Sequence, residues 1–238
     1  MQYRGKRYET TMTPHESGRG WAFFFLFTIV FPFLMGVIQR YIDDLIPVAE
    51  ANVLYYLFAA CIVFVLFWQF LKGSFSYLLD HLGRNILAIL IGFVVDIPLH
   101  VLVMKFPYPI ENPNTFSYPE QFTLSSSATI LILLVLIPIV EEVLFRGLLF
   151  GSIRRHSRLL AWMVSIGIYC FYSVWLFAFV PSGGVDLRYL LLGFQYIPSA
   201  LALTFCYEKG GSVWSSMVLH AAVNASFLFS SLSTYTIL

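Results

Sequence analysis

Long runs of apolar residues, separated by short polar segments, dominate the chain from residue 21 to residue 233. About 20 helical residues cross the hydrocarbon core of a bilayer, and runs of that length recur along this sequence. The pattern predicts seven membrane-spanning helices, at about 21–39, 52–71, 86–104, 127–150, 159–180, 188–206 and 212–233. Pro98 and Pro198 lie inside two of these runs, and a helix break at one of them would raise the number to eight. The predicted fold class is an all-α, polytopic transmembrane bundle.

Three regions follow one another along the chain. Residues 1–20 are a polar, basic segment that we expect on the cytoplasmic side. Residues 21–126 hold the first spans and an outer loop, 105–126, whose prolines and asparagines predict irregular or surface-lying structure. Residues 127–238 form the membrane-embedded core that carries the candidate chemistry. No internal repeat or appended soluble domain is apparent in the sequence, so we expect one membrane domain.

The composition strengthens the membrane interpretation and narrows the partners. Of 238 residues, 59% are hydrophobic and only 11% are charged, whereas a soluble domain is about 25% charged. The main partner is therefore the lipid bilayer. The formal net charge of +1 gives no electrostatic basis for nucleic-acid binding. The cysteines, Cys61, Cys170 and Cys206, fall inside apolar runs, and we expect free thiols.

The distribution of lysine and arginine predicts the orientation in the membrane. With the N-terminus inside, the outer segments contain Arg40, Lys105 and Arg188. The cytoplasmic segments contain ten cations, which are Arg4, Lys6, Arg7, Arg19, Lys72, Arg84, Arg154, Arg155, Arg158 and Lys209. The positive-inside rule then predicts an integral plasma membrane protein with a cytoplasmic N-terminus and an outer C-terminus.

Two glutamates and an arginine interrupt the fourth apolar run, in "PIVEEVLFRGLL". Charge inside hydrocarbon is costly, so a helix that carries it usually has a functional reason to do so. Glu142 and Arg146 lie on one helix face and predict a buried ion pair. Glu141 lies about 100° further round the helix, so its carboxylate stays available as a general base or acid. The alternative is that all three residues only lock helices together.

Two more polar pairs have the four-residue spacing of one helix face. His220 and Asn224, in "VLHAAVNASF", can both donate hydrogen bonds toward an oxyanion, or they can bond neighbouring helices. His220 can also ligate a metal, although Asn is a poor partner for zinc. Asp96 can orient the imidazole of His100, and a self-contained structural pair is the alternative for these two residues.

The two motifs resemble those of the CPBP intramembrane proteases, the group that contains the Ras-converting CAAX endopeptidase and the bacterial Abi proteins. The first motif of that family, Glu-Glu-x-x-x-Arg, is matched by Glu141, Glu142 and Arg146. The last, His-x-x-x-Asn or Asp, is matched by His220 and Asn224. The resemblance implies an intramembrane endopeptidase in which the first Glu activates water and the final His and Asn stabilise the oxyanion.

The resemblance covers roughly residues 127–228, and the middle motif departs from it. The family has Phe-x-x-x-His, and this chain has "FYSVW", which places Phe171 at the aromatic position and Trp175 at the histidine position. An indole N–H cannot accept a proton. The resemblance then leaves three possibilities: Glu141 acts alone, His100 takes over, or catalysis is lost. We expect Phe171, Trp175 and His100 to line the substrate cavity, and Trp175→His to raise the activity.

The predicted function is hydrolysis of a peptide bond in a peptide or membrane-tethered protein, with Glu141 as general base and His220 with Asn224 as oxyanion site. No cofactor is expected, and zinc is the alternative. Bacterial relatives are linked by this resemblance to peptide processing and bacteriocin self-immunity. One rival is a catalytically impaired relative that binds a membrane partner. Another is a transporter or proton relay, which the lack of repeats and of matching broken helices disfavours.

Overall fold

The computed structural model describes residues 12–35, 48–179 and 184–235, and these residues are mostly helical. The elements, with η for a π- or 3₁₀-helix, are α1 (Pro14–Phe25), η1 (Leu26–Val30), α3 (Val48–Leu66), α4 (Trp68–Asp80), α5 (Leu82–Met104), α6 (Asn114–Leu124), α7 (Ser126–Leu131), η2 (Ile132–Leu136), α8 (Ile137–Glu141), η3 (Glu142–Phe150), α9 (Gly151–Arg154), α10 (Arg158–Tyr172), η4 (Trp175–Ala178), η5 (Leu187–Tyr196), α11 (Ile197–Gly210) and α12 (Val213–Tyr235). Within these ranges, Phe179 and Val185 form an isolated antiparallel bridge.

Several of these helices are long and apolar enough to cross a membrane. Five single spans are found in the described part of the chain: Pro14–Met35, Leu82–Met104, Ser126–Arg154, Leu187–Gly210 and Val213–Ser233. The bent pair Glu50–Leu66 and Trp68–Asp80 adds a sixth if it is one span. The chain is therefore an integral membrane protein, and the predicted all-α, polytopic bundle is confirmed.

The spans differ from the prediction in two places. The helix expected at 159–180 is α10, which ends at Tyr172 after 15 residues and is shorter than a full crossing. The run expected at 52–71 is broken at Phe67, where α3 and α4 meet at 84°. Pro98 lies inside an unbroken α5, and Pro198 lies in the first turn of α11, where its missing N–H is not needed. Neither proline divides a span.

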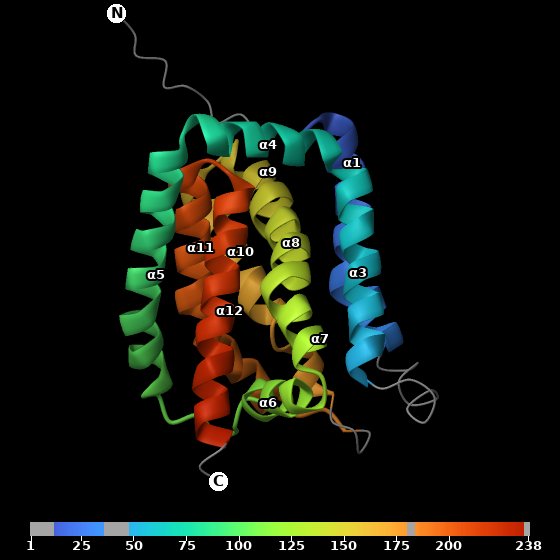
Figure 1. Cartoon of the computed structure of the whole chain (residues 1–238), viewed down its shortest axis with the longest axis vertical. Coiled ribbons are helices and arrows are strands. Elements are labelled where there is room, and N and C mark those ends of the chain that lie inside the picture. The colour runs from blue at the N-terminus through green and yellow to red at the C-terminus, as the bar shows by residue number, and fades with distance from the viewer. Residues whose placement is uncertain (1–11, 36–47, 180–183, 236–238) are drawn as a thin grey trace, which may run out of the picture.

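α1 begins earlier than the apolar pattern predicts because Thr13 and Glu16 form a capping box. The Thr13 hydroxyl accepts a hydrogen bond from the Glu16 N–H at 3.2 Å, and the Glu16 carboxylate accepts one from the Thr13 N–H at 2.9 Å. The same carboxylate also accepts from the N–H of Phe70, in the first turn of α4, at 3.0 Å. This contact fastens α4 across the end of the bundle, nearly perpendicular to α3 (Figure 1).

Aromatic side chains fill the space between α1, α4 and η3. Phe67, Phe70 and Phe145 are completely or almost completely buried. Gly147 follows the arginine of the first motif, and a Cβ atom there would lie 2.8 Å from the Phe70 ring. The glycine is therefore required for α4 to pack directly on η3, and this packing closes one end of the bundle.

The end of the bundle that holds α4 and α9 also contains an ion-pair cluster centred on Glu208 of α11. Its carboxylate accepts from Arg154 Nε at 2.6 Å, from an Arg158 terminal nitrogen at 2.8 Å and from Trp162 Nε1 at 3.1 Å. One acceptor therefore joins α9, α10 and α11.

Replacing Glu208 should loosen this junction. We expect Glu208→Ala to lower the free energy of unfolding by about 1–3 kcal/mol, because three donors lose a charged acceptor. Unfolding in mixed micelles, followed by circular dichroism, measures the change. Glu120→Ala, which removes an exposed carboxylate of α6, is the matched control and should leave the unfolding transition in place.

Candidate active site

The glutamates lie in the middle of the span Ser126–Arg154, which alternates between α- and π-helical turns. In η2 the N–H of Ile137 bonds to the carbonyl of Ile132, five residues earlier. By the same five-residue spacing, the carbonyl of Leu133 would accept a hydrogen bond from the N–H of residue 138. That residue is Pro138, which has no N–H. Asn224 Nδ2 on α12 supplies the missing donor at 2.8 Å. Asn224 therefore fixes α12 against the helix of the glutamates, directly before the first motif.

Glu142 is the centre of a buried polar chain. Its Oε1 atom accepts from the Arg146 guanidinium at 2.9 Å, and both side chains are fully buried. The same oxygen lies 2.8 Å from His220 Nδ1, so this ring nitrogen carries the proton and donates to the carboxylate. The predicted Glu142–Arg146 pair is present. Sequence reasoning missed that Glu142 also orients His220.

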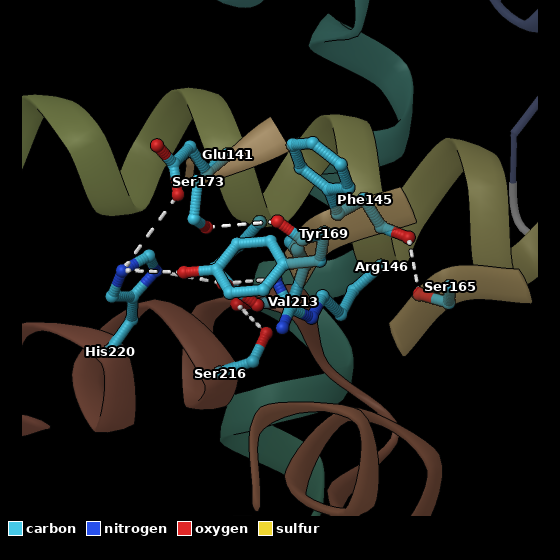
Figure 2. A network of polar contacts seen from close by, with 10 residues as sticks. Glu141, Phe145, Arg146, Ser165, Tyr169, Ser173, Val213, Ser216 and His220 are labelled. Atoms are coloured by element: carbon cyan, nitrogen blue, oxygen red, sulfur yellow. Dashed lines mark hydrogen bonds and ion pairs between the residues drawn. The ribbon is translucent and has the colours of Figure 1, made fainter. Parts of the chain in front are cut away.

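Glu141 lies on the other side of the imidazole. Its Oε2 atom is 3.9 Å from His220 Nε2, and its side chain is almost entirely buried. The hydroxyl of Tyr169 on α10 is 3.5 Å from the same nitrogen, and the Tyr169 ring stacks 4.3 Å below the Arg146 guanidinium carbon. Figure 2 shows Glu141, Tyr169 and His220 converging from three separate helices.

A cavity of about 630 Å³ opens beside this pair and brings the predicted residues Glu141, His220 and Asn224 to one wall. The rest of its lining in the described residues is mainly aromatic and amide side chains, including Asn52, Tyr55, Tyr56, Asn114, Tyr118, Tyr169, Tyr172, Ser173, Phe177 and Tyr196. Burial, with smaller effects of Tyr196 and Glu141, raises the pKa of Tyr118 well above its usual range. The Tyr118 phenol therefore stays neutral and can donate a hydrogen bond.

His100 and Asp96 lie outside the main cavity. His100 lines a smaller adjoining space of about 70 Å³, which also touches His220 and Asn224. Asp96 accepts a hydrogen bond from Ser199 at 3.1 Å and thereby joins α5 to α11. This agrees with a structural role for Asp96.

The two residues of the predicted middle motif lie away from the main cavity. Neither Phe171 nor Trp175 lines the main cavity. Phe171 is 56% exposed on the same outward face of α10 as Leu159 and Met163. Trp175 lies beyond the end of α10 and packs edge-on against Phe179, with ring centroids 5.9 Å apart. The structure does not bring these two residues to the cavity, because Phe171 lies on the outward face of α10 and Trp175 lies after the helix has ended.

Tyr169 and Ser173 occupy the cavity positions that were assigned to Phe171 and Trp175. They share the aromatic-x-x-x spacing, two residues earlier in the sequence, and both line the cavity. Ser173 follows the last residue of α10, and its hydroxyl donates to the Tyr169 carbonyl at 2.9 Å (Figure 2). The missed signal is the recurrence of hydroxyl residues every four positions, at Ser165, Tyr169 and Ser173.

The donor set does not fit zinc. Glu142 faces Nδ1 of His220 and Glu141 faces Nε2. The two carboxylates therefore lie on different edges of the imidazole ring and do not point at one common position. Among residues 12–35, 48–179 and 184–235, no three His, Cys, Asp or Glu side chains converge as metal ligands. A zinc site requires at least three such protein ligands, so these side chains do not form one.

The helical bundle thus places a buried carboxylate–imidazole pair at the wall of a cavity. Residues 123–226 match the family model described as Type II CAAX prenyl endopeptidase Rce1-like. This segment, somewhat less than half of the chain, is a domain of that CAAX protease (CPBP) family, whose members are endopeptidases. The resemblance seen in the motifs is thus confirmed. No curated protein and no solved structure matches the chain.

Proposed function

We propose that this protein is an intramembrane endopeptidase that hydrolyses a peptide bond inside the 630 Å³ cavity. The proposal rests on one observation. Glu141 Oε2 and His220 Nε2 face each other at the cavity wall, 3.9 Å apart. A water molecule bound on the cavity side of a carboxylate base, next to an imidazolium donor, has an arrangement that amide hydrolysis can use.

The reaction uses Glu141 as the general base. Its carboxylate takes a proton from water as the water oxygen attacks the carbonyl carbon of the substrate. The former carbonyl oxygen then carries the negative charge of the tetrahedral intermediate. Glu141 returns the proton to the departing nitrogen as the C–N bond breaks, which regenerates the carboxylate and leaves a new carboxyl end and a new amine.

We assign stabilisation of the oxyanion to His220, Tyr169 and Asn224. Because His220 Nδ1 donates to Glu142, the imidazole is held in one orientation with Nε2 toward Glu141 and Tyr169. In the imidazolium form Nε2–H donates to the oxyanion, and the Tyr169 hydroxyl can donate beside it. One amide hydrogen of Asn224 is used by the Leu133 carbonyl, and the second remains available to the substrate.

We infer from the cavity lining that Ser173, which lies four residues after Tyr169, takes the place of the family's middle histidine. A serine hydroxyl at this place positions water but is a poor proton acceptor. Glu141 then carries the base function alone. This substitution is also the observation that favours the second candidate, a catalytically impaired relative that acts by binding a membrane partner.

Restoring the histidine should raise the rate of hydrolysis. We expect Ser173→His to increase kcat by roughly tenfold or more, as a positioned acid–base group typically contributes 10²–10⁴-fold. Trp175→His is the matched control, because Trp175 lies outside the cavity, and it should leave kcat unchanged. If Trp175→His activates and Ser173→His does not, the assignment of Ser173 to the place of the middle histidine is wrong.

A peptide library tests the proposed function itself. Purified protein in detergent is incubated with quenched fluorogenic peptides, and fragments are identified by mass spectrometry. Cleavage by the wild type that disappears in Glu141→Ala supports the endopeptidase. If wild type and Glu141→Ala give the same cellular phenotype, the partner-binding candidate replaces the endopeptidase proposal.

A further inference from the structure

The two ends of the bundle differ sharply in charge. One end is formed by α4, α9 and the adjoining helix termini (Figure 1). These segments contain seven described cations, which are Arg19, Lys72, Arg84, Arg154, Arg155, Arg158 and Lys209. At the other end the described cations are Lys105 and Arg188, and Arg188 is paired with Asp186 at 2.7 Å. The positive-inside rule assigns the α4/α9 end to the cytoplasm.

Packed side chains separate the cavity from this cationic end. η3 runs from Glu142 to α9, and all nine of its residues are buried. Phe70 of α4 closes on Gly147 of η3, at the contact that leaves no room for a Cβ atom. A substrate segment that approached from the α4/α9 end would have to disrupt this aromatic core.

The cavity opens in the other direction. Asn114 and Tyr118 of α6, which lies at the far end of the bundle in Figure 1, belong to its lining. Phe179 and Val185, which lie outside the candidate membrane spans, also line it, and they are 55% and 61% exposed. These exposed lining residues mark the mouth, and α6 places it at the end away from the cationic cluster.

The lining suits an uncharged stretch of polypeptide. Tyrosine, phenylalanine and asparagine side chains dominate it, and Glu141 is the acidic group among the lining residues that the structure describes. Phenol and amide groups can bond the carbonyls and N–H groups of an extended peptide while the aromatic rings pack on apolar side chains. An acidic side chain next to the scissile bond would meet Glu141 and be repelled.

From the position of the mouth and the charge of the opposite end, we propose that the scissile bond enters from the non-cytoplasmic side. The substrate is an uncharged, apolar or aromatic segment of a peptide or membrane protein exposed on that side. The proposal rests on the proposed peptidase function, and it adds the side from which the substrate comes and the chemistry of the segment.

Thiol labelling tests the side of the mouth without requiring catalysis. Val185→Cys and Lys72→Cys are made in a background in which Cys61, Cys170 and Cys206 are alanine, and are treated with a membrane-impermeant maleimide. We expect Val185→Cys to react in sealed right-side-out vesicles and Lys72→Cys to react in sealed inside-out vesicles. The reverse pattern, or reaction of both variants from one side, overturns the proposal.

Peptide cleavage gives a second, independent test with the natural cysteines in place. A membrane-impermeant quenched peptide that the detergent-solubilised protein cleaves is added outside sealed vesicles of each orientation, and the Glu141→Gln signal is subtracted. Cleavage in right-side-out vesicles alone supports the proposal. Cleavage in inside-out vesicles alone overturns it while the peptidase function stands. If no peptide is cleaved even in detergent, the peptidase function fails, and the labelling result alone decides the side of the mouth.

Discussion

Glu141→Gln should reduce peptide hydrolysis by about 10²–10⁴-fold, which is the typical contribution of a positioned general base. The amide keeps the size of the carboxylate but cannot take a proton from water. The change is isosteric, so His220, 3.9 Å away, should keep its bond to Glu142. The loss is expected in kcat rather than in KM, because the substrate still fits the same cavity.

The matched control for this variant is Glu120→Gln. Glu120 is an exposed residue of α6 that does not line the cavity. The Glu120→Gln substitution removes the same charge as Glu141→Gln, and the variant should retain the wild-type kcat. Initial rates on one cleaved peptide, measured for both variants after their folding is verified by circular dichroism, give the comparison. A Glu141→Gln enzyme with undiminished kcat would remove Glu141 from the base role.

Arg146→Met should be the most destabilising single change in the site. The Arg146 guanidinium and the Glu142 carboxylate are fully buried and bonded at 2.9 Å. Removing one partner of a buried pair leaves an uncompensated charge and costs about 3–5 kcal/mol. The stacking of Arg146 on the Tyr169 ring is lost as well. The expected result is a lower unfolding midpoint in mixed micelles, with a loss of activity that follows the loss of folded protein.

Two further variants distinguish charge imbalance from a simple loss of packing. In Glu142→Gln/Arg146→Met the remaining buried charge is neutralised, so part of the stability should return. Arg155→Met alters an exposed arginine near the end of the same span and should leave the unfolding midpoint unchanged. If the double variant is less stable than Arg146→Met, the stability of the site does not depend on neutralising Glu142.

The membrane class and the motif pairs could be predicted from the sequence because both depend on local spacing. A run of about 20 apolar residues already predicts a span, and a four-residue interval already places Glu142 beside Arg146. The convergence of Glu141 and His220 on one cavity was expected from the family resemblance, and the geometry agrees with it.

The remaining features depend on contacts between distant segments. The bend between α3 and α4 is held by Glu16, 54 positions before Phe70 in the sequence, and no apolar run indicates that contact. The bond between Glu142 and His220 joins residues 78 positions apart. The motif spacing alone did not show which face of α10 meets the cavity: Tyr169 lines it, whereas Phe171 is exposed.

The most direct test of the central claim is hydrolysis in water enriched in ¹⁸O, with purified wild type and Glu141→Gln and one peptide found in the library. If Glu141 activates water at the cavity wall, the wild type gives a fragment whose new carboxyl group carries the heavy isotope, and the variant gives almost none. Folded wild-type protein that yields no labelled fragment, or a variant that yields as much as the wild type, contradicts the account.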